Sequence, residues 1–261
     1  MRPLILLSND DGYAAEGLIA LRDQLARHAD VVVCAPETNQ SATSHSLSLH
    51  RVLRLRHHGP GVFALDGTPA DCVYVALHSG VRVLPRRPDL VVSGMNHGLN
   101  LGSDIFYSGT IAAAREGALR GIPAIAVSAD GGADREAAAT VGAQLALALL
   151  EAARRGAPRP APLLNVNFPP GSAWPIRATR IGARLYTEEV LFRDDPRGRE
   201  YLWIGGAGVR HDHVPGSDTE AYDEGCASVT PLTLDLWASG HAELVTGLVA
   251  EHVSKPDPGG T

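Results

Sequence analysis

Two adjacent carboxylates lie near the start of the chain, in the segment Asn9-Asp10-Asp11-Gly12. They follow a short apolar run over residues 3–8, which is typical of a buried strand. Open α/β sheets bind ligands beyond the carboxyl ends of their strands, and Gly12 lets the backbone turn so that both carboxylates could converge. Because two anions that close together repel, a hard divalent cation between them is one interpretation. The other is a polar turn in which an Asp caps the next helix.

A second loop with ligand-binding character covers residues 93–102 and also follows a buried apolar run. Three glycines spaced four apart suit a backbone that approaches a ligand closely, although the spacing is neither Gly-x-Gly-x-x-Gly nor a Walker A sequence. Asn96 and Asn100 lie between these glycines and can supply neutral oxygen ligands or amide donors. Glycine and asparagine turns without a ligand are the alternative.

Two further segments carry hydroxyl groups. Ser108, Gly109 and Thr110 open an alanine-rich helix, where Ser or Thr acts as an N-cap and the free N–H groups can bind phosphate. The polar loop over residues 35–46 follows the second predicted strand and offers Ser41 as a ligand and His45 as a polar contact or proton donor.

Short, continuous apolar runs alternate with helical patterns along the first two thirds of the chain. This alternation predicts an α/β fold, a Rossmann-like, doubly wound and mainly parallel sheet. Residues 47–55 alternate Leu with Ser, His and Arg and predict a half-exposed antiparallel strand. The predicted parallel strands are Leu4–Ser8, Val31–Ala35, Leu90–Ser93, Ala124–Ser128 and Leu163–Asn167.

The chain changes character after Pro169 and becomes rich in loops. Residues 186–192 and 199–204 flank a turn sequence at residues 194–198, which predicts a β-hairpin. Its apolar side chains need cover that an isolated hairpin does not give, and another subunit could provide it. We therefore divide the chain into a Rossmann-like catalytic domain, residues 1–170, and a C-terminal hairpin and oligomerisation region, residues 171–261, that completes the fold.

Composition narrows the class of protein. A chain of 261 residues with 44% hydrophobic residues is long enough for one large α/β domain with an elaborated C-terminal part. Without an evident membrane span or secretory signal we expect a cytoplasmic location and no membrane partner. The net charge of -6 argues against binding to a nucleic-acid polymer. Three widely spaced cysteines suggest buried apolar residues, and the sequence His211-Asp212-His213 suggests a polar loop rather than a zinc site.

Five longer motifs occur in order along the chain. They are Asn-Asp-Asp-Gly from Asn9, Ala-Pro from Ala35 with Gln40-Ser41, Gly-Thr-Pro-Ala-Asp-Cys-Val from Gly67, Ser-Gly-x-Asn-x-Gly-x-Asn-x-Gly from Ser93, and Tyr-Ser-Gly-Thr-x-x-Ala-Ala-x-Glu-Gly from Tyr107. Together they closely resemble the SurE (survival protein E) family of metal-dependent nucleotidases. The resemblance is dense over residues 3–130 and continues more weakly to residue 232. One departure is Ala42, where many members have Gly.

The resemblance implies a metal site and an activity. It implies one divalent metal ion per subunit, Mg²⁺ or Mn²⁺, held by Asp10, Asp11, Ser41 and Asn96. It also implies hydrolysis of nucleoside 5′-monophosphates, in some members also of 3′-monophosphates and short polyphosphate. The usual architecture exchanges the C-terminal hairpin and tail between subunits of a homodimer or homotetramer.

The expected reaction is attack of a metal-activated water on phosphorus, with the transferred phosphoryl oxygens held by a four-residue phosphate site. Asp10, Asp11 and Asn96 are the predicted catalytic residues, and one of the two Asp residues is the first choice for the proton acceptor. A haloacid-dehalogenase-type phosphatase would instead need Asp-x-Asp, and a non-catalytic nucleotide-binding protein on a Rossmann-like sheet is the alternative function. The predicted phosphate site consists of Asn100, Ser108, Gly109 and Thr110.

Overall fold

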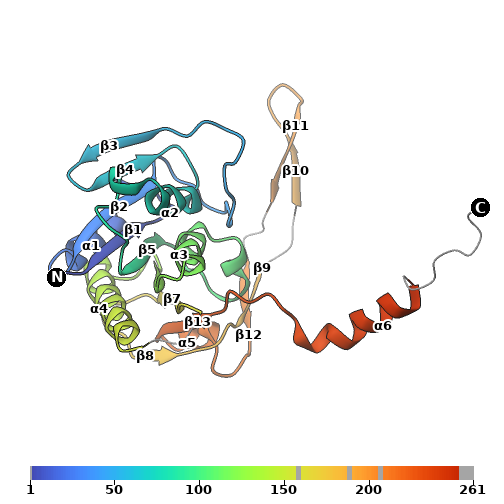
Figure 1. Ribbon diagram of the computed structural model, residues 1–261. Coiled ribbons are helices and arrows are strands. Elements are labelled where there is room, and N and C mark those ends of the chain that lie inside the picture. The colour runs from blue at the N-terminus through green and yellow to red at the C-terminus, as the bar shows by residue number, and fades with distance from the viewer. Residues whose placement is uncertain (1, 157–159, 187–189, 205–207, 253–261) are drawn as a thin grey trace, which may run out of the picture.

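A nine-stranded sheet forms the centre of the computed structural model, which describes residues 2–156, 160–186, 190–204 and 208–252 (Figure 1). Strands β4, β2, β1, β5, β6 and β7 run parallel, and β3 and β13 are antiparallel to β4 and β7. The predicted α/β class with a mainly parallel sheet is confirmed. In spatial order the strands are β3 (Leu55–Gly59), β4 (Val62–Leu65), β2 (Asp30–Pro36), β1 (Leu4–Ser8), β5 (Leu90–His97), β6 (Ala124–Ala129), β7 (Leu163–Phe168), β13 (Ala227–Leu232) and β8 (Ile176–Ala178).

Helices cover both faces of this sheet. On β1, Ile5 and Leu7 belong to one buried cluster and Leu4 and Leu6 to the other, because successive side chains of a strand point to opposite faces. The first cluster includes apolar residues of α1 (Glu16–Leu25) and α4 (Arg135–Arg154), and the second those of α2 (Pro69–His78) and α3 (Gly109–Leu119). The parallel strands are therefore buried on both sides, which accounts for their continuous apolar sequences.

Helix α4 is long and apolar enough, by length and composition, to cross a membrane. Its buried side chains, among them Ala139, Ala146 and Leu150, pack against the first apolar cluster of the sheet. The helix is therefore part of the core, as is common for a long apolar helix of an α/β domain.

Several parts of the first hundred residues differ from the expectation, and strand β4 was not predicted. The strand predicted over residues 47–55 is wrong up to residue 54, and β3 starts only at Leu55. Leu49 is 76% exposed, so the alternation of Leu with polar residues does not reflect a buried face. Helix α2 was not predicted, although its start is marked by a capping box between Thr68 and Asp71 with Pro69 in the first turn.

The C-terminal region contributes to the central sheet and also extends away from it. Its strands β8 and β13 complete the nine-stranded sheet. Strands β9 (Ala183–Tyr186) and β12 (Val209–Asp212) form one antiparallel pair, and β10 (Val190–Asp194) and β11 (Glu200–Ile204) form the predicted hairpin.

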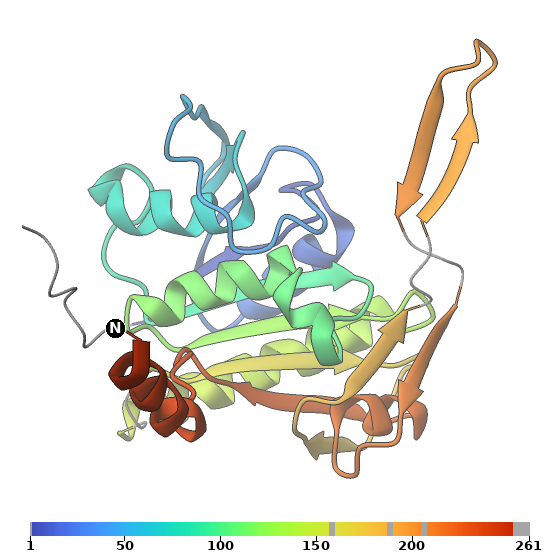
Figure 2. The same ribbon diagram turned by 90° about the vertical axis from the view of Figure 1, so that its right-hand side faces the viewer.

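The hairpin projects from the body of the molecule in both views, and α6 (Ala242–His252) stands off from it in Figure 1 (Figures 1 and 2). Every residue of β10 and β11 is exposed. The remaining elements are α5 (Asp218–Asp223) and three short 3₁₀ helices, η1 (Gly80–Arg82), η2 (Gly102–Phe106) and η3 (Ser239–His241).

Candidate active site

The turn after β1 is built by Asn9, which is fully buried. Its Nδ2 donates to the Gly12 carbonyl oxygen at 2.9 Å, and its Oδ1 accepts from the Gly12 N–H at 3.2 Å. Gly12 has a φ of 109°, which favours glycine. Helix α1 begins only at Glu16, its N-cap is Ala15 and it has no side-chain cap. The interpretation that an Asp of this segment caps α1 is therefore wrong.

Asp10 is a buried carboxylate with one strong hydrogen bond. It is 4% exposed, and its Oδ1 accepts a hydrogen bond from Thr110 Oγ1 at 2.6 Å. Burial raises the pKa of Asp10 to about 6, and the neighbouring charge of Asp11 adds to this rise. The hydrogen bond from Thr110 lowers the pKa but does not offset the effect of burial. A carboxylate in this environment gains from a nearby cation.

Asp11 is held at both oxygens. Its Oδ2 accepts from the backbone N–H of His97 at 2.9 Å, and its Oδ1 accepts from Asn39 Nδ2 at 3.3 Å. Asn39 Oδ1 in turn accepts from the hydroxyl of Ser41 at 2.6 Å and from its backbone N–H at 2.8 Å. Asn39 therefore links Asp11 to Ser41, two of the predicted metal ligands.

Asn96 lies near the end of β5, where the pairing with β6 is irregular between Ser93 and Asn96. A Cβ atom at Gly94 would lie 2.2 Å from the Val127 carbonyl oxygen, so this close approach requires glycine. Asn96 Nδ2 donates to the Gly98 carbonyl oxygen at 2.8 Å, which leaves the side-chain oxygen as the atom that suits a cation.

The start of α3 approaches Asp10 directly. Ser108 is the N-cap, and its Oγ accepts from the Ile111 N–H at 3.1 Å. A Cβ atom at Gly109 would lie 2.8 Å from the Cβ of Asp10, so only glycine permits this separation. Ser108 is thus a helix cap, and the positive end of the α3 dipole lies beside the buried carboxylate.

Asn100 is fixed by an amide network that sequence analysis missed. Its backbone N–H donates to Asn167 Oδ1 at 2.7 Å, and its carbonyl oxygen accepts from Asn165 at 2.8 Å and from Asn167 at 3.2 Å. Its side-chain nitrogen lies 2.8 Å from Ser128 Oγ. Asn165 and Asn167 lie on one face of a strand that is otherwise apolar. They could have revealed this network in the sequence, because buried amides need hydrogen-bond partners.

Two cavities open at this edge of the sheet. The first, which we call the Asn100 cavity, has a volume of about 310 Å³. Five of the eight predicted site residues line it, and Thr110 and Gly109 contact Asp10 in its wall. The lining residues from the prediction are Asp10, Ser41, Asn96, Asn100 and Ser108.

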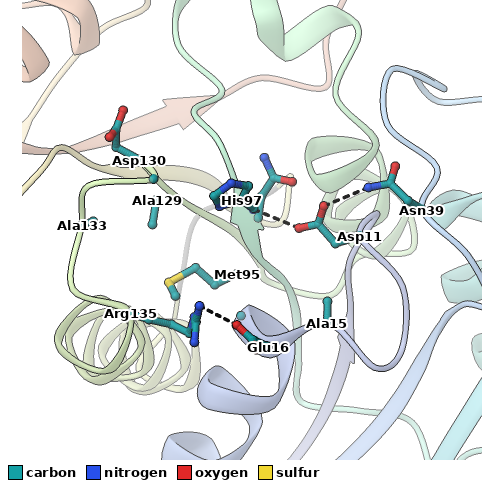
Figure 3. A pocket seen from close by; sticks show the side chains of 13 residues that line it. Asp11, Ala15, Glu16, Asn39, Met95, His97, Ala129, Asp130, Ala133 and Arg135 are labelled. Atoms are coloured by element: carbon teal, nitrogen blue, oxygen red, sulfur yellow. Dashed lines mark hydrogen bonds and ion pairs between the residues drawn. The ribbon is translucent and has the colours of Figure 1, made fainter.

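The second, the Met95 cavity, has a volume of about 420 Å³ and is lined by Asp11 (Figure 3). It shares Asn96 and His97 with the Asn100 cavity. Figure 3 shows Asp11 bonded to His97 on one side and Asn39 on the other, with the ion pair of Glu16 and Arg135 nearby. The predicted metal ligands thus lie around the boundary between two neighbouring cavities.

The set of donors fits a hard divalent cation. Two carboxylates, a hydroxyl and a side-chain amide provide only oxygen ligands, the type that Mg²⁺ and Mn²⁺ prefer. Among the residues that the structure describes, no three His, Cys, Asp or Glu side chains gather to hold a metal ion. His211 Nδ1 instead pairs with Asp223 at 2.8 Å and His213 Nδ1 with Glu220 at 3.7 Å.

Comparison with known proteins agrees with this geometry. The model of the family "Survival protein SurE" matches residues 5–188, well over half of the chain. The chain belongs to the SurE family. The match includes every predicted site residue and extends into β9.

Full-length SurE relatives are similar over nearly the whole chain. A protein of Sorangium cellulosum (strain So ce56) named 5′-nucleotidase SurE is 76% identical over 258 residues, which are 99% of this chain and 100% of that protein. A protein of the same name from Anaeromyxobacter dehalogenans (strain 2CP-C) is 52% identical over 88% of this chain and 90% of its own length. The crystal structure of the SurE protein from Aquifex aeolicus has a TM-score of 0.79 and 38% sequence identity, and the match covers 94% of this chain and 99% of that one.

His45, which was predicted to be a polar contact or proton donor at the site, forms a polar contact with α3 instead. It does not line the two cavities, and its Nε2 lies 3.0 Å from Glu116 Oε2 on α3. Glu116 is 1% exposed and also pairs with Arg120 at 2.8 Å. In this member of the SurE family the His45–Glu116 pair fastens the Ser41 loop to the helix that begins at the site.

Proposed function

We propose that this chain is a metal-dependent 5′-nucleotidase that hydrolyses nucleoside 5′-monophosphates to nucleoside and phosphate. The observation that carries the proposal is the buried carboxylate of Asp10, in contact with the N-terminus of α3 and adjacent to Asp11. The names of the full-length SurE relatives support the reaction class.

We propose that one divalent ion per subunit, Mg²⁺ or Mn²⁺, is held by Asp10, Asp11, Ser41 and Asn96. The hydrogen bonds from Thr110 to Asp10 and from His97 and Asn39 to Asp11 restrict rotation of both carboxylates. Such outer contacts orient ligands and raise affinity for a metal. When bound, the ion supplies positive charge for the substrate phosphate and lowers the pKa of a bound water.

The start of α3 is suited to hold the phosphate. A phosphomonoester carries about -1.5 to -2 charge near neutral pH, and free N–H groups at a helix N-terminus are favourable partners for it. Gly109 and Thr110 occupy the first turn of α3, Ser108 caps it and Asn100 lines the same cavity. We propose that these four residues hold the phosphoryl oxygens while water attacks in line.

The carboxylates are the groups that can take the proton from the attacking water. One carboxylate of the pair, Asp10 or Asp11, is our first choice for this role, because both lie where the water would be bound. We assign direct displacement rather than a phosphoenzyme, because Asp10 and Asp11 are adjacent and both are assigned to the metal. An Asp-x-Asp phosphatase would keep one carboxylate free as a nucleophile.

We also propose the further substrates, the location, the domain division and the assembly that the family resemblance implies. Substrates would include nucleoside 3′-monophosphates and short polyphosphate, and the enzyme would work in the cytoplasm. Residues 1–170 would form the catalytic domain, and residues 171–261 would build a homodimer or homotetramer by exchange of the β10–β11 hairpin. The exposed apolar side chains of that hairpin support an interface with a second copy.

A hydrolysis panel tests the proposal. Purified protein is assayed on nucleoside 5′- and 3′-monophosphates with Mg²⁺, with Mn²⁺ and with EDTA, and released phosphate is measured. We expect activity on 5′-monophosphates that EDTA abolishes and either cation restores.

Two variants test whether the activity depends on the proposed metal site. Substitution of a residue that hydrogen-bonds to a metal ligand typically reduces activity roughly 10–100-fold. Asp11→Asn changes a proposed ligand itself and should reduce turnover by more than this. Asp23→Asn, an exposed carboxylate paired with Arg22 on α1, serves as the matched control and should leave turnover unchanged. Full activity in metal-free protein would sink the metal assignment. Nucleotide binding without hydrolysis would favour the non-catalytic alternative.

A further inference from the structure

The C-terminal strands form one wall of the Asn100 cavity. Tyr186, at the end of β9, lines this cavity together with Asp104 of η2. Asp104 is a third carboxylate at a site that, under the proposed function, has to receive a phosphate. A bare carboxylate there would repel the substrate.

The charge of Asp104 is compensated by β9. Arg184 Nη1 lies 2.6 Å from Asp104 Oδ2, and Tyr186 Oη donates to Asp104 Oδ1 at 2.7 Å. The side chains of Arg184 and Asp104 are 17% and 12% exposed, so solvent screens this pair weakly. Burial and the adjacent Asp104 raise the pKa of Tyr186 to about 12, so the phenol keeps its proton and remains a donor.

The backbone around this pair is held independently of the ion pair. Asp218, fully buried at the start of α5, accepts from the Gly102 N–H at 3.1 Å and from the Gly182 N–H at 2.7 Å. A Cβ atom at Gly102 would lie 2.8 Å from the backbone nitrogen of Arg184, so η2 and β9 are in direct contact. Loss of the Arg184 charge therefore leaves the Asp104 carboxylate in the cavity wall.

We propose that Arg184 is a positioning residue for the phosphate site, which holds the Asp104 carboxylate in an ion pair and so neutralises its charge beside the incoming phosphate. This inference rests on the proposed function. It assigns part of the substrate site to the C-terminal region, beyond the residues that the motifs point to. The role is electrostatic, so it predicts the sign of the effect of each substitution.

Binding of inorganic phosphate to the Mg²⁺-loaded protein, measured by calorimetry, tests this role. Arg184→Gln should weaken phosphate binding roughly tenfold at low salt, and the loss should shrink in about 0.5 M salt, where charges are screened. In the double variant Asp104→Asn with Arg184→Gln, affinity should return to within about threefold of the parent protein, because the repelling charge is gone as well. Asp104→Asn alone should bind phosphate as well as the parent or more tightly, because it leaves the arginine uncompensated.

The kinetic readout separates this role from a general structural one. On a nucleoside 5′-monophosphate, Arg184→Gln should raise KM in the same proportion as the phosphate dissociation constant and change kcat little. Arg184→Lys keeps the charge and should recover most of the affinity. Arg177→Gln, which removes an arginine paired with Glu224 on the same C-terminal region but outside both cavities, is the matched control and should change neither value.

Two outcomes would overturn the inference. One is a double variant that binds phosphate as poorly as Arg184→Gln, and the other is weaker binding in Asp104→Asn alone. If thermal unfolding shows that Arg184→Gln does not fold, the sign of the change in Asp104→Asn still decides. Failure of the proposed function is distinct, because the parent protein would then neither bind phosphate in a metal-dependent manner nor release it from nucleotides.

Discussion

The carboxyl edge of the parallel sheet buries polar side chains, whereas the β10–β11 hairpin exposes apolar side chains to water. At the sheet edge Asp10 and Asn100 are polar and buried, whereas on the hairpin Phe192 is 61% exposed and Trp203 64% exposed. Burying a carboxylate raises its free energy, and so does exposing a large apolar side chain to water. Each arrangement therefore supports one of our proposals, a cation with a phosphate at the edge and a second copy of the chain on the hairpin.

The two regions also differ in how their positions are fixed. The edge is held by hydrogen bonds between distant segments, such as Thr110 to Asp10 and Asn100 to Asn167. The hairpin is held mainly by its own ladder, in which Leu191 pairs with Trp203 and Phe192 with Leu202. Substitutions at the edge should therefore change rates, and substitutions on the hairpin should change association.

Among variants of residues that are not proposed metal ligands, the largest effect that we expect concerns Thr110. Thr110→Ala removes the hydroxyl that holds Oδ1 of the buried Asp10 and lies at the start of α3. Thr110 Oγ1 has one proton and donates it to Asp10, so its loss acts through the orientation of a proposed metal ligand. Such a loss commonly costs about 10–100-fold, and we expect a fall in kcat of this size. Steady-state hydrolysis of a nucleoside monophosphate is the measurement.

Two controls accompany this experiment. Thr140→Ala removes a hydroxyl that bonds a carbonyl of its own helix, α4, and should leave kcat unchanged. Ser108→Ala removes the α3 cap and should lower stability by about 1 kcal/mol, with any loss of rate smaller than for Thr110→Ala. Unchanged kcat and phosphate affinity in both Ser108→Ala and Thr110→Ala would mean that these hydroxyls only shape the helix.

The next effect concerns the hairpin and assembly. Replacing residues 190–204 by a short Gly/Ser linker removes the exposed apolar strands and keeps Tyr186 in the wall of the Asn100 cavity. Each large apolar side chain taken out of water contributes roughly 1.5–3 kcal/mol, so several together can sustain a subunit interface. We expect light scattering to give a smaller mass than for the parent, and turnover per subunit to change less than it does in Thr110→Ala.

Arg197→Gln, at the tip of the hairpin, is the control and should preserve the oligomer mass. An unchanged mass in the folded linker variant would refute the role of the hairpin. Tyr186 of the same C-terminal region lines the Asn100 cavity, so the linker variant keeps this residue in place.

The sequence alone predicted those elements and residues that a short, local sequence pattern marks. Five apolar runs predicted five of the six parallel strands, because strands buried on both faces have continuous apolar sequences. The sixth, β4, was not predicted, and only its second half is buried. Asp10 and Asp11 were recognisable because they follow a strand directly. Residues 47–54 were predicted wrongly because alternation cannot show that Leu49 is exposed and that Ser48 bonds to Asp71 instead of to a strand.

The parts that sequence could not predict depend on contacts over long distances. Asn39 between Asp11 and Ser41, and Arg184 on Asp104, are parts of the site that no local spacing marks. Arg184 and Asp104 are 80 positions apart, and only the packing of β9 on η2 brings them together. Within the SurE family match, the motifs pointed to the proposed metal ligands, whereas the side chains that hydrogen-bond to those ligands become apparent only in the fold.

The smallest effect concerns pH and is confined to the sheet edge. The pKa of Asp10 is raised from 3.8 to about 6 in the folded, metal-free protein, so between these pH values the folded state binds more protons than the unfolded state. The sign is opposite to that of a salt-bridged Asp, since stability falls as pH rises through this window. The shift amounts to about 2–3 kcal/mol, an order-of-magnitude figure for a group this deeply buried.

Asp10→Asn isolates this contribution, because the amide oxygen can still accept from Thr110 while no proton is bound or released. We expect metal-free Asp10→Asn to become more stable than the metal-free parent between about pH 4 and pH 6 and to keep that advantage at pH 7. Urea unfolding of both proteins with EDTA at each pH measures it, and the raised pKa of Asp218 cancels because both proteins contain that group. Added Mg²⁺ should reverse the order above pH 6, since a cation binds the deprotonated carboxylate and stabilises only the protein that has one. A difference in stability that does not change with pH would mean that Asp10 is already ionised when the site is empty, and that burial alone does not create the demand for a cation.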